Sequence, residues 1–422
     1  MTVAVRLLQV AVHVTTAIAR MAVVAVAVRR RAALAREVAR LLERLGGAFL
    51  KTGQLLATRV DVVGEVLAAE LGRLHDHVAP MPARQALSAA RRAFAEPPAE
   101  MLTALAGPPI ASGSIACVYR MTWKGRDLAV KVRRPEVVRS FAADTAIVSG
   151  LARLASRVPR FARLPLTDIV GQMGDALRGQ LDFAQEARYL RRLREDLADV
   201  DGVVVPEPVD ELTAGGVITM TFAEDLAGQP GDRASVERGV TTLVRAVYHM
   251  LFVRGFIHVD LHQGNAYIRP GGEVVVLDAG FMFPLSEMAR TRFTQFFAGM
   301  IKGDGELCAR ILLASARGVA NGADVTGFQR EVAELVNRSS GAVAKDFELG
   351  PFAVRLFDLQ REYAVFAEPE FVFPLLCLLA LEGTVRRLHP LMDFQIEAAP
   401  YVMHGLLMAP LTASGTPENI AI

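Results

Sequence analysis

The stretch that decides the fold is His258-Val259-Asp260-Leu261-His262-Gln263-Gly264-Asn265, together with Leu277-Asp278-Ala279-Gly280, which begins twelve residues after Asn265. Between the two lies Pro270-Gly271-Gly272-Glu273, whose glycines favour a two-residue hairpin loop. A hairpin with that loop would place Asn265 opposite Asp278. Because Mg²⁺ prefers oxygen ligands, an amide oxygen beside a carboxylate suits it. Asn265 and Asp278 are therefore the predicted metal ligands.

Asp260 stands five residues before Asn265 and is left free to orient or deprotonate an attacking hydroxyl group or water. The order H-x-D-L-x-x-x-N followed by D-x-G has the spacing of the catalytic loop and metal-binding segment of kinase-like phosphotransferases. Each element alone is common and could be an ordinary loop or hairpin residue. Their combination predicts a site for ATP and Mg²⁺.

A charged residue, Lys131, stands on an apolar strand earlier in the chain. In Leu128-Ala129-Val130-Lys131-Val132, Ala129 and Lys131 share one face, and lysine is scarce because only five of the 47 basic residues are lysines. In kinase chemistry such a lysine neutralises nucleotide phosphates, a small alanine leaves room for adenine, and a helix carboxylate holds the lysine. We expect Glu186 to be that carboxylate. The alternatives are a lysine that reaches solvent and a glutamate paired with a neighbouring arginine.

The segment from Ala111 to Ser114, with Ser112 and Gly113 between them, lies where a phosphate-covering turn between two strands would fall. Its small residues would let backbone N–H groups approach phosphates. We also expect Val118, Ala129 and Met220 to contact the nucleotide.

Composition restricts the class of protein. The 422 residues are 52% hydrophobic and carry 47 basic and 45 acidic side chains, so the chain should fold and has no basic field for nucleic acid. The three cysteines are far apart, which fits buried thiols in a reducing compartment. We expect a cytoplasmic protein that does not bind nucleic acid.

The N-terminal segment is apolar but carries one polar stripe. Between residues 7 and 28, Gln9, His13, Thr16 and Arg20 recur at helical steps, and Arg29, Arg30 and Arg31 follow. This arrangement favours a helix on the inner face of a membrane, and the alternatives are a buried core helix, a true span and a cleaved signal. Arg20 is the main argument against a span.

The chain is expected to contain four parts. Residues 1–31 form the amphipathic helix, 32–107 a helical extension, 108–222 a small sheet-bearing lobe and 223–422 a helical lobe. Within the third part, Lys124-Gly125-Arg126-Asp127 predicts the turn of a β-hairpin. A helix around residues 167–197, strands around 203–222 and helices after Pro284 complete the prediction.

These residues resemble the UbiB/AarF atypical kinase family, which is associated with isoprenoid quinone (ubiquinone) biosynthesis. Lys51-Thr52-Gly53-Gln54 matches its K-x-G-Q motif, and 109–119 resembles its alanine-rich loop. Leu181-Asp182-Phe183 with Glu186-Ala187 resembles its E-L-D-F-x-x-E-A helix, and 379–390 resembles its late L-E-G-x-x-R-x-L-x-P segment. The resemblance runs from about Gly46 to about Pro400.

The resemblance implies an α+β, bilobal protein-kinase-like fold with a small antiparallel-sheet N-lobe, a helical C-lobe and an N-terminal helical extension. Lys51 and Gln54 would belong to the active site, although spacing alone would make them a surface pair. The implied activity is that of an ATPase that handles a prenyl lipid or quinone precursor at the membrane, in a protein that can form a homodimer.

The sequence also departs from this family. Gln180 stands where the first acid of the E-x-D motif is expected, so Lys51 is expected to turn to Asp182 instead. Ala279 replaces the phenylalanine of D-F-G, and Thr221 stands where a hinge glutamate is common. Two other functions stay open, namely a nucleotide-gated lipid-binding or scaffold protein with little turnover and a soluble small-molecule phosphotransferase.

Overall fold

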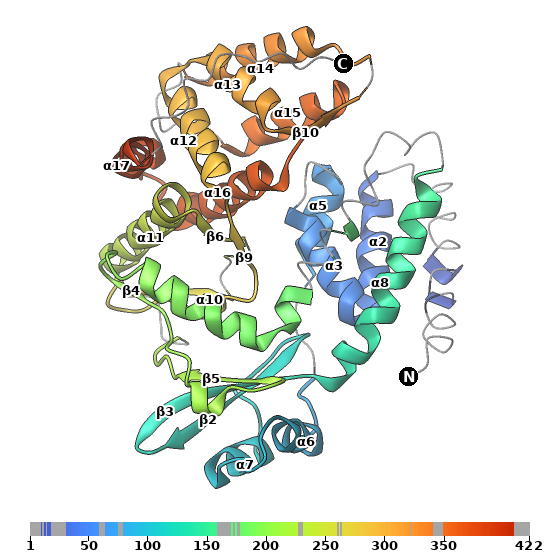
Figure 1. Ribbon diagram of the computed structural model, residues 1–422, viewed down its shortest axis with the longest axis vertical. Coiled ribbons are helices and arrows are strands. Elements are labelled where there is room, and N and C mark those ends of the chain that lie inside the picture. Colours follow the sequence, from blue (N-terminus) through green and yellow to red (C-terminus); the bar gives the residue numbers. More distant parts are fainter. Residues whose placement is uncertain are drawn as a thin grey trace. The chain divides into compact units, whose positions relative to one another are not determined.

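The protein is described by a computed structural model (Figure 1). It describes residues 10, 12, 13, 15–17, 31–58, 64–74, 79–157, 170, 171, 174, 178–226, 231–259, 261, 264–320, 322–340 and 349–408. The chain divides into two compact units, and each is treated by itself below. Unit 1 comprises residues 1–195, 204–227 and 275–281, and unit 2 comprises 196–203, 228–274 and 282–422.

A four-stranded antiparallel sheet is the centre of unit 1. Its strands are β1 (Ala111–Ser112), β2 (Ala116–Trp123), β3 (Arg126–Arg133) and β5 (Val217–Thr221), in the order β1-β2-β3-β5. Trp123 pairs with Arg126, so the turn between β2 and β3 contains only Lys124 and Gly125, both with positive φ. The expected hairpin is present, but β3 begins two residues earlier than expected because this primed turn needs only two residues.

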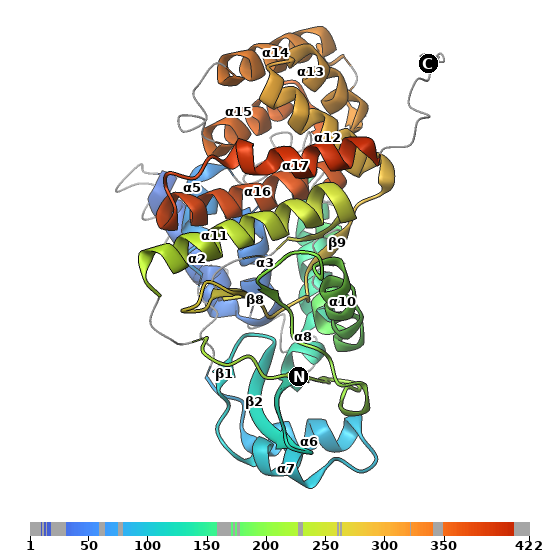
Figure 2. The same ribbon diagram turned by 90° about the vertical axis from the view of Figure 1, so that its left-hand side faces the viewer.

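Two helices cover one face of this sheet (Figure 2). Alternate residues of β2 and β3, including Tyr119, Met121, Val130 and Val132, are buried against α6 (Ala83–Ala93) and α7 (Ala99–Ala106). Because side chains alternate along a strand, Ala129 and Lys131 point to the other face. The face of the sheet that carries Ala129 and Lys131 is therefore not the one covered by α6 and α7.

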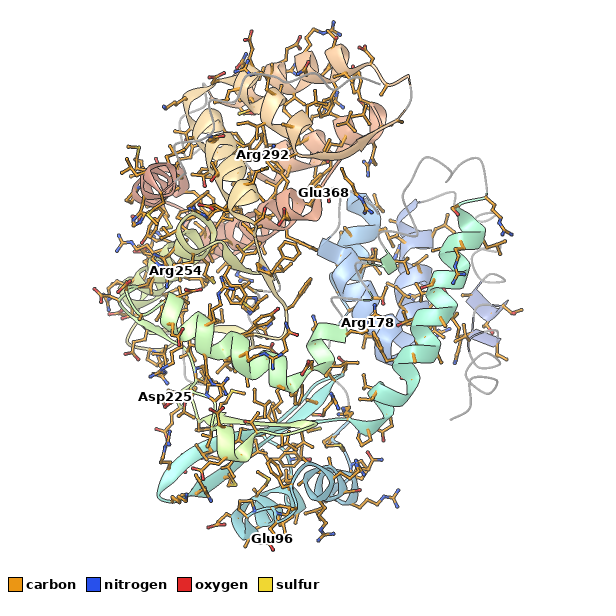
Figure 3. The ribbon with its side chains drawn as sticks, viewed as in Figure 1. Glu96, Arg178, Asp225, Arg254, Arg292 and Glu368 are labelled. Atoms are coloured by element: carbon orange, nitrogen blue, oxygen red, sulfur yellow. The ribbon has the colours of Figure 1, made fainter. Side chains whose placement is uncertain are left out.

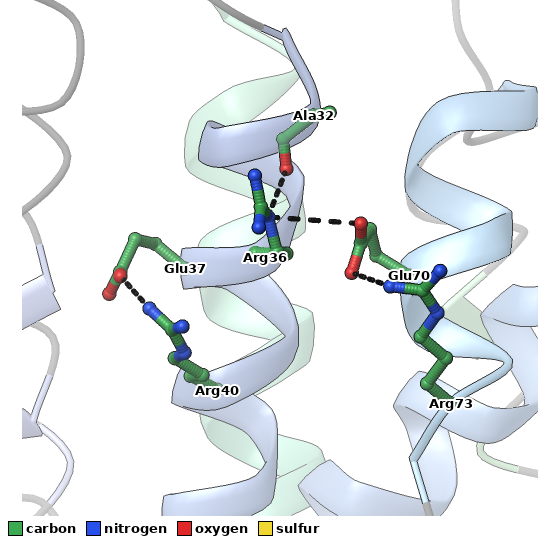
Figure 4. Close-up of polar contacts among 6 residues, drawn as sticks. All are labelled: Ala32, Arg36, Glu37, Arg40, Glu70 and Arg73. Carbon is green, nitrogen blue, oxygen red and sulfur yellow. Dashed lines mark hydrogen bonds and ion pairs between the residues drawn. The ribbon is translucent and has the colours of Figure 1, made fainter. Parts of the chain in front are cut away.

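Three further helices, α2 (Arg31–Leu45), α3 (Gly47–Thr58) and α5 (Glu65–Leu71), pack together in unit 1. Glu70 on α5 accepts a hydrogen bond from Arg73, Nη1 to Oε2 3.3 Å, and lies 3.9 Å from Arg36 Nε on α2 (Figure 4). A Cβ on Gly53 would lie 2.6 Å from Leu74 Cδ1, so the glycine of K-x-G-Q permits the close approach of α3. The helical extension expected over residues 32–107 consists of several helices, and Gly46, with a φ of 59°, separates α2 from α3.

Unit 1 also contains the long helix α8 (Pro135–Ala155), which contacts α3, and nearly all of α10 (Phe183–Asp196). A short 3₁₀ turn, Asp210–Leu212, precedes β5. The described residues of the segment expected to be helical around 167–197 are helical at 170, 171, 174 and 178–181 and in α10.

Unit 2 is mainly helical. Its helices are α11 (Arg233–Tyr248), α12 (Glu287–Lys302), α13 (Gly305–Ala314), α14 (Val325–Ser340), α15 (Leu349–Glu362), α16 (Pro369–Leu388) and α17 (Phe394–Leu407). Tyr248 is buried and donates a hydrogen bond to the Phe394 carbonyl oxygen, 2.7 Å, and its ring meets those of Phe252 and Phe297. Arg254, labelled in Figure 3, forms an ion pair with Asp196 at 2.6 Å. The helical character expected after Pro284 is confirmed.

The segment that leads to Asp260 has an unusual backbone. α11 continues into a π-helical turn, His249–Arg254, which ends at Gly255 with a φ of 62°. Arg290 donates a hydrogen bond to the Phe252 carbonyl oxygen at 3.0 Å. β6 (Phe256–His258) follows and pairs with β9 (Met282–Pro284). The H-x-D-L-x-x-x-N sequence, which starts at His258, therefore follows directly after this turn and β6.

Two small sheets complete the described strands. β4 (Val203–Val204), β8 (Val274–Val276) and β7 (Ala266–Ile268) form one, and β10 (Ala316–Val319) pairs with β11 (Val365–Ala367) in the other. Among the described helices, none combines the length and apolar character needed to cross a bilayer. Most of the amphipathic segment expected over residues 1–31 lies outside the described residues.

The hairpin formed by β7 and β8 differs from the expected one. The Arg269 N–H donates to the Glu273 carbonyl oxygen at 2.8 Å, and the Gly272 N–H donates to the Arg269 carbonyl oxygen at 2.8 Å. Gly272 has a φ of 91°, so the loop contains three residues rather than two. Counted outward from this closing pair, the register is one residue away from the one that would pair Asn265 with Asp278. The predicted two-residue loop was therefore wrong.

Candidate active site

Lys131 is the centre of a group of three charged side chains in unit 1. Its Nζ lies 2.6 Å from Glu186 Oε1 on α10 and 2.9 Å from Asp278 Oδ2. The exposed fractions of the three side chains are 15% for Lys131, 1% for Glu186 and 34% for Asp278. The structure thus brings together three of the residues singled out from sequence, and Asp278 is the one that solvent reaches best.

Burial and charge act on this group in opposite directions. Burial lowers the pKa of Lys131, but the carboxylates of Asp278 and Glu186 raise it more, so the pKa lies above its ordinary value and the ammonium stays charged. Burial raises the pKa of Glu186 to about 7, although Lys131 opposes this effect. Glu186 Oε2 is buried without a hydrogen-bond partner in the described part of the chain.

Asp278 is oriented by its own backbone. The Gly280 N–H donates to Asp278 Oδ1 at 2.6 Å, and a Cβ on Gly280 would lie 2.9 Å from the same oxygen. Such a Cβ would also lie 3.8 Å from Cγ of Gln180. Gln180 is buried, and among the described residues its Oε1 has no hydrogen-bond partner. The residue that replaces the expected acid is therefore a neighbour of the D-A-G segment.

The start of α10 positions Glu186. Asp182 Oδ1 accepts hydrogen bonds from the Ala184 and Gln185 N–H groups, both at 3.1 Å, which caps the helix. The Phe183 ring centroid lies 5.2 Å from Lys131 Nζ. Asp182 is therefore engaged with its own helix, whereas the contact expected between Asp182 and Lys51 lies outside the described side chains.

Four of the residues expected to contact the nucleotide share the face of the sheet that carries Lys131, whereas Ser112 pairs with Cys117 and lies on the face that packs on α6 and α7. Ala111 pairs with Val118, and Val118 pairs with Lys131 across β1, β2 and β3. Ala129 pairs with Met220 across β3 and β5. Since directly paired residues lie on the same face, these side chains form one surface opposite α6 and α7.

A residue that the sequence analysis did not identify holds the turn after β1. Arg134 is buried and donates to the Gly113 carbonyl oxygen at 2.9 Å and to Ser112 Oγ at 2.8 Å. Its backbone N–H donates to the Ile115 carbonyl oxygen at 2.8 Å. Ser114 is also buried. The predicted phosphate-covering turn is therefore fixed by an arginine, which an arginine-rich sequence does not distinguish from its neighbours.

For the other predicted site residues the structure describes only some positions or side chains. Asn265 is half-buried and belongs to unit 2, and Asp260 lies outside the described residues. Lys51 and Gln54 lie on α3, but their side chains are likewise outside the described part.

Within the described residues, no group of three His, Cys, Asp or Glu side chains could hold a metal ion by itself. Mg²⁺ is usually bound through one or two carboxylates together with substrate phosphates. The Asp278 carboxylate is partly exposed, so a Mg²⁺ ion that also binds substrate phosphates can reach it.

Comparison with known proteins gives the family. The model of the ABC1 atypical kinase-like domain matches residues 73–312, more than half of the chain. A solved structure of Rv3197 with erythromycin, from Mycobacterium tuberculosis, is similar to 83% of this chain and 94% of that chain, at 18% identity and a TM-score of 0.49. On the family match, the α+β chain with its bilobal kinase-like fold belongs to the ABC1 atypical kinase-like family.

Proposed function

We propose that this protein is a Mg²⁺-dependent atypical kinase or ATPase whose nucleotide site is built around Lys131. The observation that supports this most directly is the contact of the Lys131 ammonium with Glu186 and Asp278, at 2.6 and 2.9 Å. A strand lysine paired with a helix glutamate, beside an aspartate that can bind Mg²⁺, is the set of residues that kinase-like proteins use around nucleotide phosphates.

Each residue of the group has a distinct proposed role. Lys131 binds the phosphates through charge, and Glu186 holds its ammonium in place. Asp278, with Asn265 as the second ligand that the motif predicts, would hold Mg²⁺, which neutralises phosphate charge when bound. The sheet face with Ala129 and Met220 would receive adenine.

Asp260 is the proposed proton acceptor because it occupies the aspartate position of the catalytic-loop motif. It would orient the attacking hydroxyl group or water and take its proton as the phosphoryl group is transferred. With water as the acceptor the products are ADP and phosphate.

Release of ADP tests this function. The native protein should release ADP only when Mg²⁺ is present, and Asp278→Asn should lower the rate at least a hundredfold because a metal-binding carboxylate is lost. Asp201→Asn, an exposed aspartate of unit 2, is the matched control and should retain the rate. Equal rates for the native protein and Asp278→Asn would refute the assignment, and ATP binding without ADP release would favour the scaffold function.

We further propose that the activity serves prenyl-lipid or quinone metabolism on the cytoplasmic membrane face. The support is the K-x-G-Q resemblance and the polar stripe of residues 7–28 followed by three arginines. The full chain should float with anionic liposomes, and deletion of residues 1–31 should abolish flotation. If deletion leaves flotation unchanged, this segment is not the membrane anchor.

A further inference from the structure

A cavity of about 700 Å³ lies beside α6 in unit 1, apart from the Lys131 group. One wall is α6, and the others are the end of β3, the start of α8 and the Gly215-Gly216 turn before β5. Its volume is within the range of pockets that hold small molecules. None of the residues assigned to the nucleotide lines it.

The charges that line this cavity are all positive. Arg84, Arg92 and Arg133 contribute guanidinium groups, and no aspartate or glutamate is among the lining residues. Arg84 and Arg92 form no ion pair with any residue that the structure describes. Guanidinium groups gathered without a carboxylate favour an anion, and they match phosphate oxygens well.

The spacing on α6 creates the cavity. Arg84, Ser88 and Arg92 recur every four residues and therefore form one stripe, and Arg92 donates to Ser88 Oγ at 2.5 Å. Ala89 and Ala93 beside this stripe leave space, and the exposed Val138 adds an apolar patch on α8. The site thus offers room for an organic group as well as an anion.

Gln85 supplies a polar group of another kind. It lines the same cavity, and among the described residues its buried Oε1 accepts no hydrogen bond. A buried amide oxygen is costly without a donor, so a ligand with a hydroxyl group would satisfy it. A phosphate ester that also carries a hydroxyl group matches both the arginines and Gln85.

Arg133 has a partner, but it is neutral. It donates a hydrogen bond to the Leu181 carbonyl oxygen, and its guanidinium lies 5.8 Å from the Phe183 ring centroid. Burial lowers the pKa of Arg133, and the nearby Asp182 opposes this only in part. An additional anion would therefore stabilise its charge.

We propose that this cavity is a binding site for a phosphate ester, with Arg84, Arg92 and Arg133 holding the phosphate and Gln85 accepting from a hydroxyl group of the ligand. The same chemistry occurs in a free metabolite and in a phospholipid headgroup. The test below uses one probe of each kind.

The free ligand is tested by titrating the full chain with glycerol 3-phosphate while a non-hydrolysable ATP analogue and Mg²⁺ fill the nucleotide site. The double variant Arg84→Gln/Arg92→Gln should bind at least tenfold more weakly than the native protein. Arg91→Gln removes an exposed arginine of the same helix that does not line the cavity, and it should bind like the native protein. Glycerol, which lacks the phosphate group, is the control ligand.

The lipid source is tested by flotation with phosphatidylcholine vesicles that contain phosphatidic acid. A loss in the double variant but not in Arg91→Gln would support the site with a headgroup as ligand, whereas a loss only of glycerol 3-phosphate binding would support it with a free ester. If the double variant and Arg91→Gln behave alike in both experiments, the proposal is overturned. Since both arginines are exposed, equal thermal unfolding midpoints should show that all variants fold.

Discussion

At the scale of single residues, Lys131 and Glu186 illustrate how a charge can be kept inside a protein. Glu186 is 1% exposed, so its carboxylate loses nearly all hydration and depends on the ammonium 2.6 Å away. Such pairs contribute little net stability but fix geometry, which is what a phosphate-binding lysine needs. Because the pKa of Glu186 is shifted, its burial can be observed in the way the free energy of unfolding depends on pH.

Glu186→Gln should change how stability depends on pH. The folded chain holds a proton on Glu186 up to a pKa of about 7, whereas the unfolded chain releases it near 4.5. The free energy of unfolding of the native protein should therefore fall as pH rises from about 4.5 to about 7, by on the order of 3 kcal/mol more than in Glu186→Gln. Urea unfolding at several pH values measures the difference.

The control for this experiment is Glu96→Gln, which removes an exposed glutamate (Figure 3). Its unfolding free energy should follow that of the native protein at every pH. If the curves for Glu186→Gln and the native protein are parallel, burial does not raise the pKa of Glu186 in the folded state.

Lys131 could be identified before its geometry was known because a charged residue on an apolar strand is conspicuous in a sequence. Asp278 was identified by the spacing of its motif, and Glu186 as the helix carboxylate that kinase chemistry requires. Arg134 could not be identified, because nothing local separates an arginine that fills a turn from one that faces solvent. The direct contact of Lys131 with Asp278 also depends on tertiary packing across 147 positions of sequence.

At the scale of elements, the first turn of α10 connects the fold to the site. Asp182→Ala removes the acceptor for two N–H groups and should lower the free energy of unfolding by about 1 kcal/mol. Asp182→Asn retains a side-chain oxygen and should cost only a fraction of that. Urea unfolding of both variants measures this, and equal losses for Ala and Asn would show that the cap is not what Asp182 contributes.

Gly53 is an element-scale feature because it sets how closely α3 packs. In Gly53→Ala the new Cβ would meet Leu74 Cδ1 at 2.6 Å and Leu42 Cδ1 at 3.0 Å, so the free energy of unfolding should fall by about 1–3 kcal/mol. The control is Gly150→Ala on α8, where no atom lies within 4 Å and up to about 1 kcal/mol should be gained. Unfolding midpoints that rise in both variants would contradict this explanation of the glycine.

The two hairpins show why strand registers are harder to predict than strands. At Lys124-Gly125 both residues take positive φ and the loop has two residues, whereas at Pro270-Gly271-Gly272 only Gly272 does and the loop has three. Proline has no N–H to donate, so Pro270 cannot form the hydrogen-bonded pair that would close a two-residue loop, and it joins the loop as a third residue. The expected two-residue loop was wrong by this single residue.

At the scale of the whole molecule, spaced motifs were sufficient to predict the kinase-like fold, since their order along the chain is what the fold requires. The match to the ABC1 atypical kinase-like domain confirms that prediction. The packing of α6 and α7 on one face of the sheet was not predicted, because short alanine-rich helices carry little information about their partner. The cavity beside α6 was missed for the same reason.

The central claim is that the Lys131 group binds Mg²⁺ and ATP. Isothermal titration with a non-hydrolysable ATP analogue and Mg²⁺ should give at least tenfold weaker binding for Lys131→Met than for the native protein. Lys124→Met is the control, because Lys124 is an exposed lysine on the neighbouring turn whose ion pair with Glu211, at 3.4 Å, is also exposed, and it should bind like the native protein.

Should Lys131→Met fail to fold, Asp278→Asn replaces it in the same titration and should lose affinity for the analogue in the presence of Mg²⁺. The account predicts weaker binding in these two variants and unchanged binding in Lys124→Met. Binding as tight as that of the native protein in a folded Lys131→Met would contradict it.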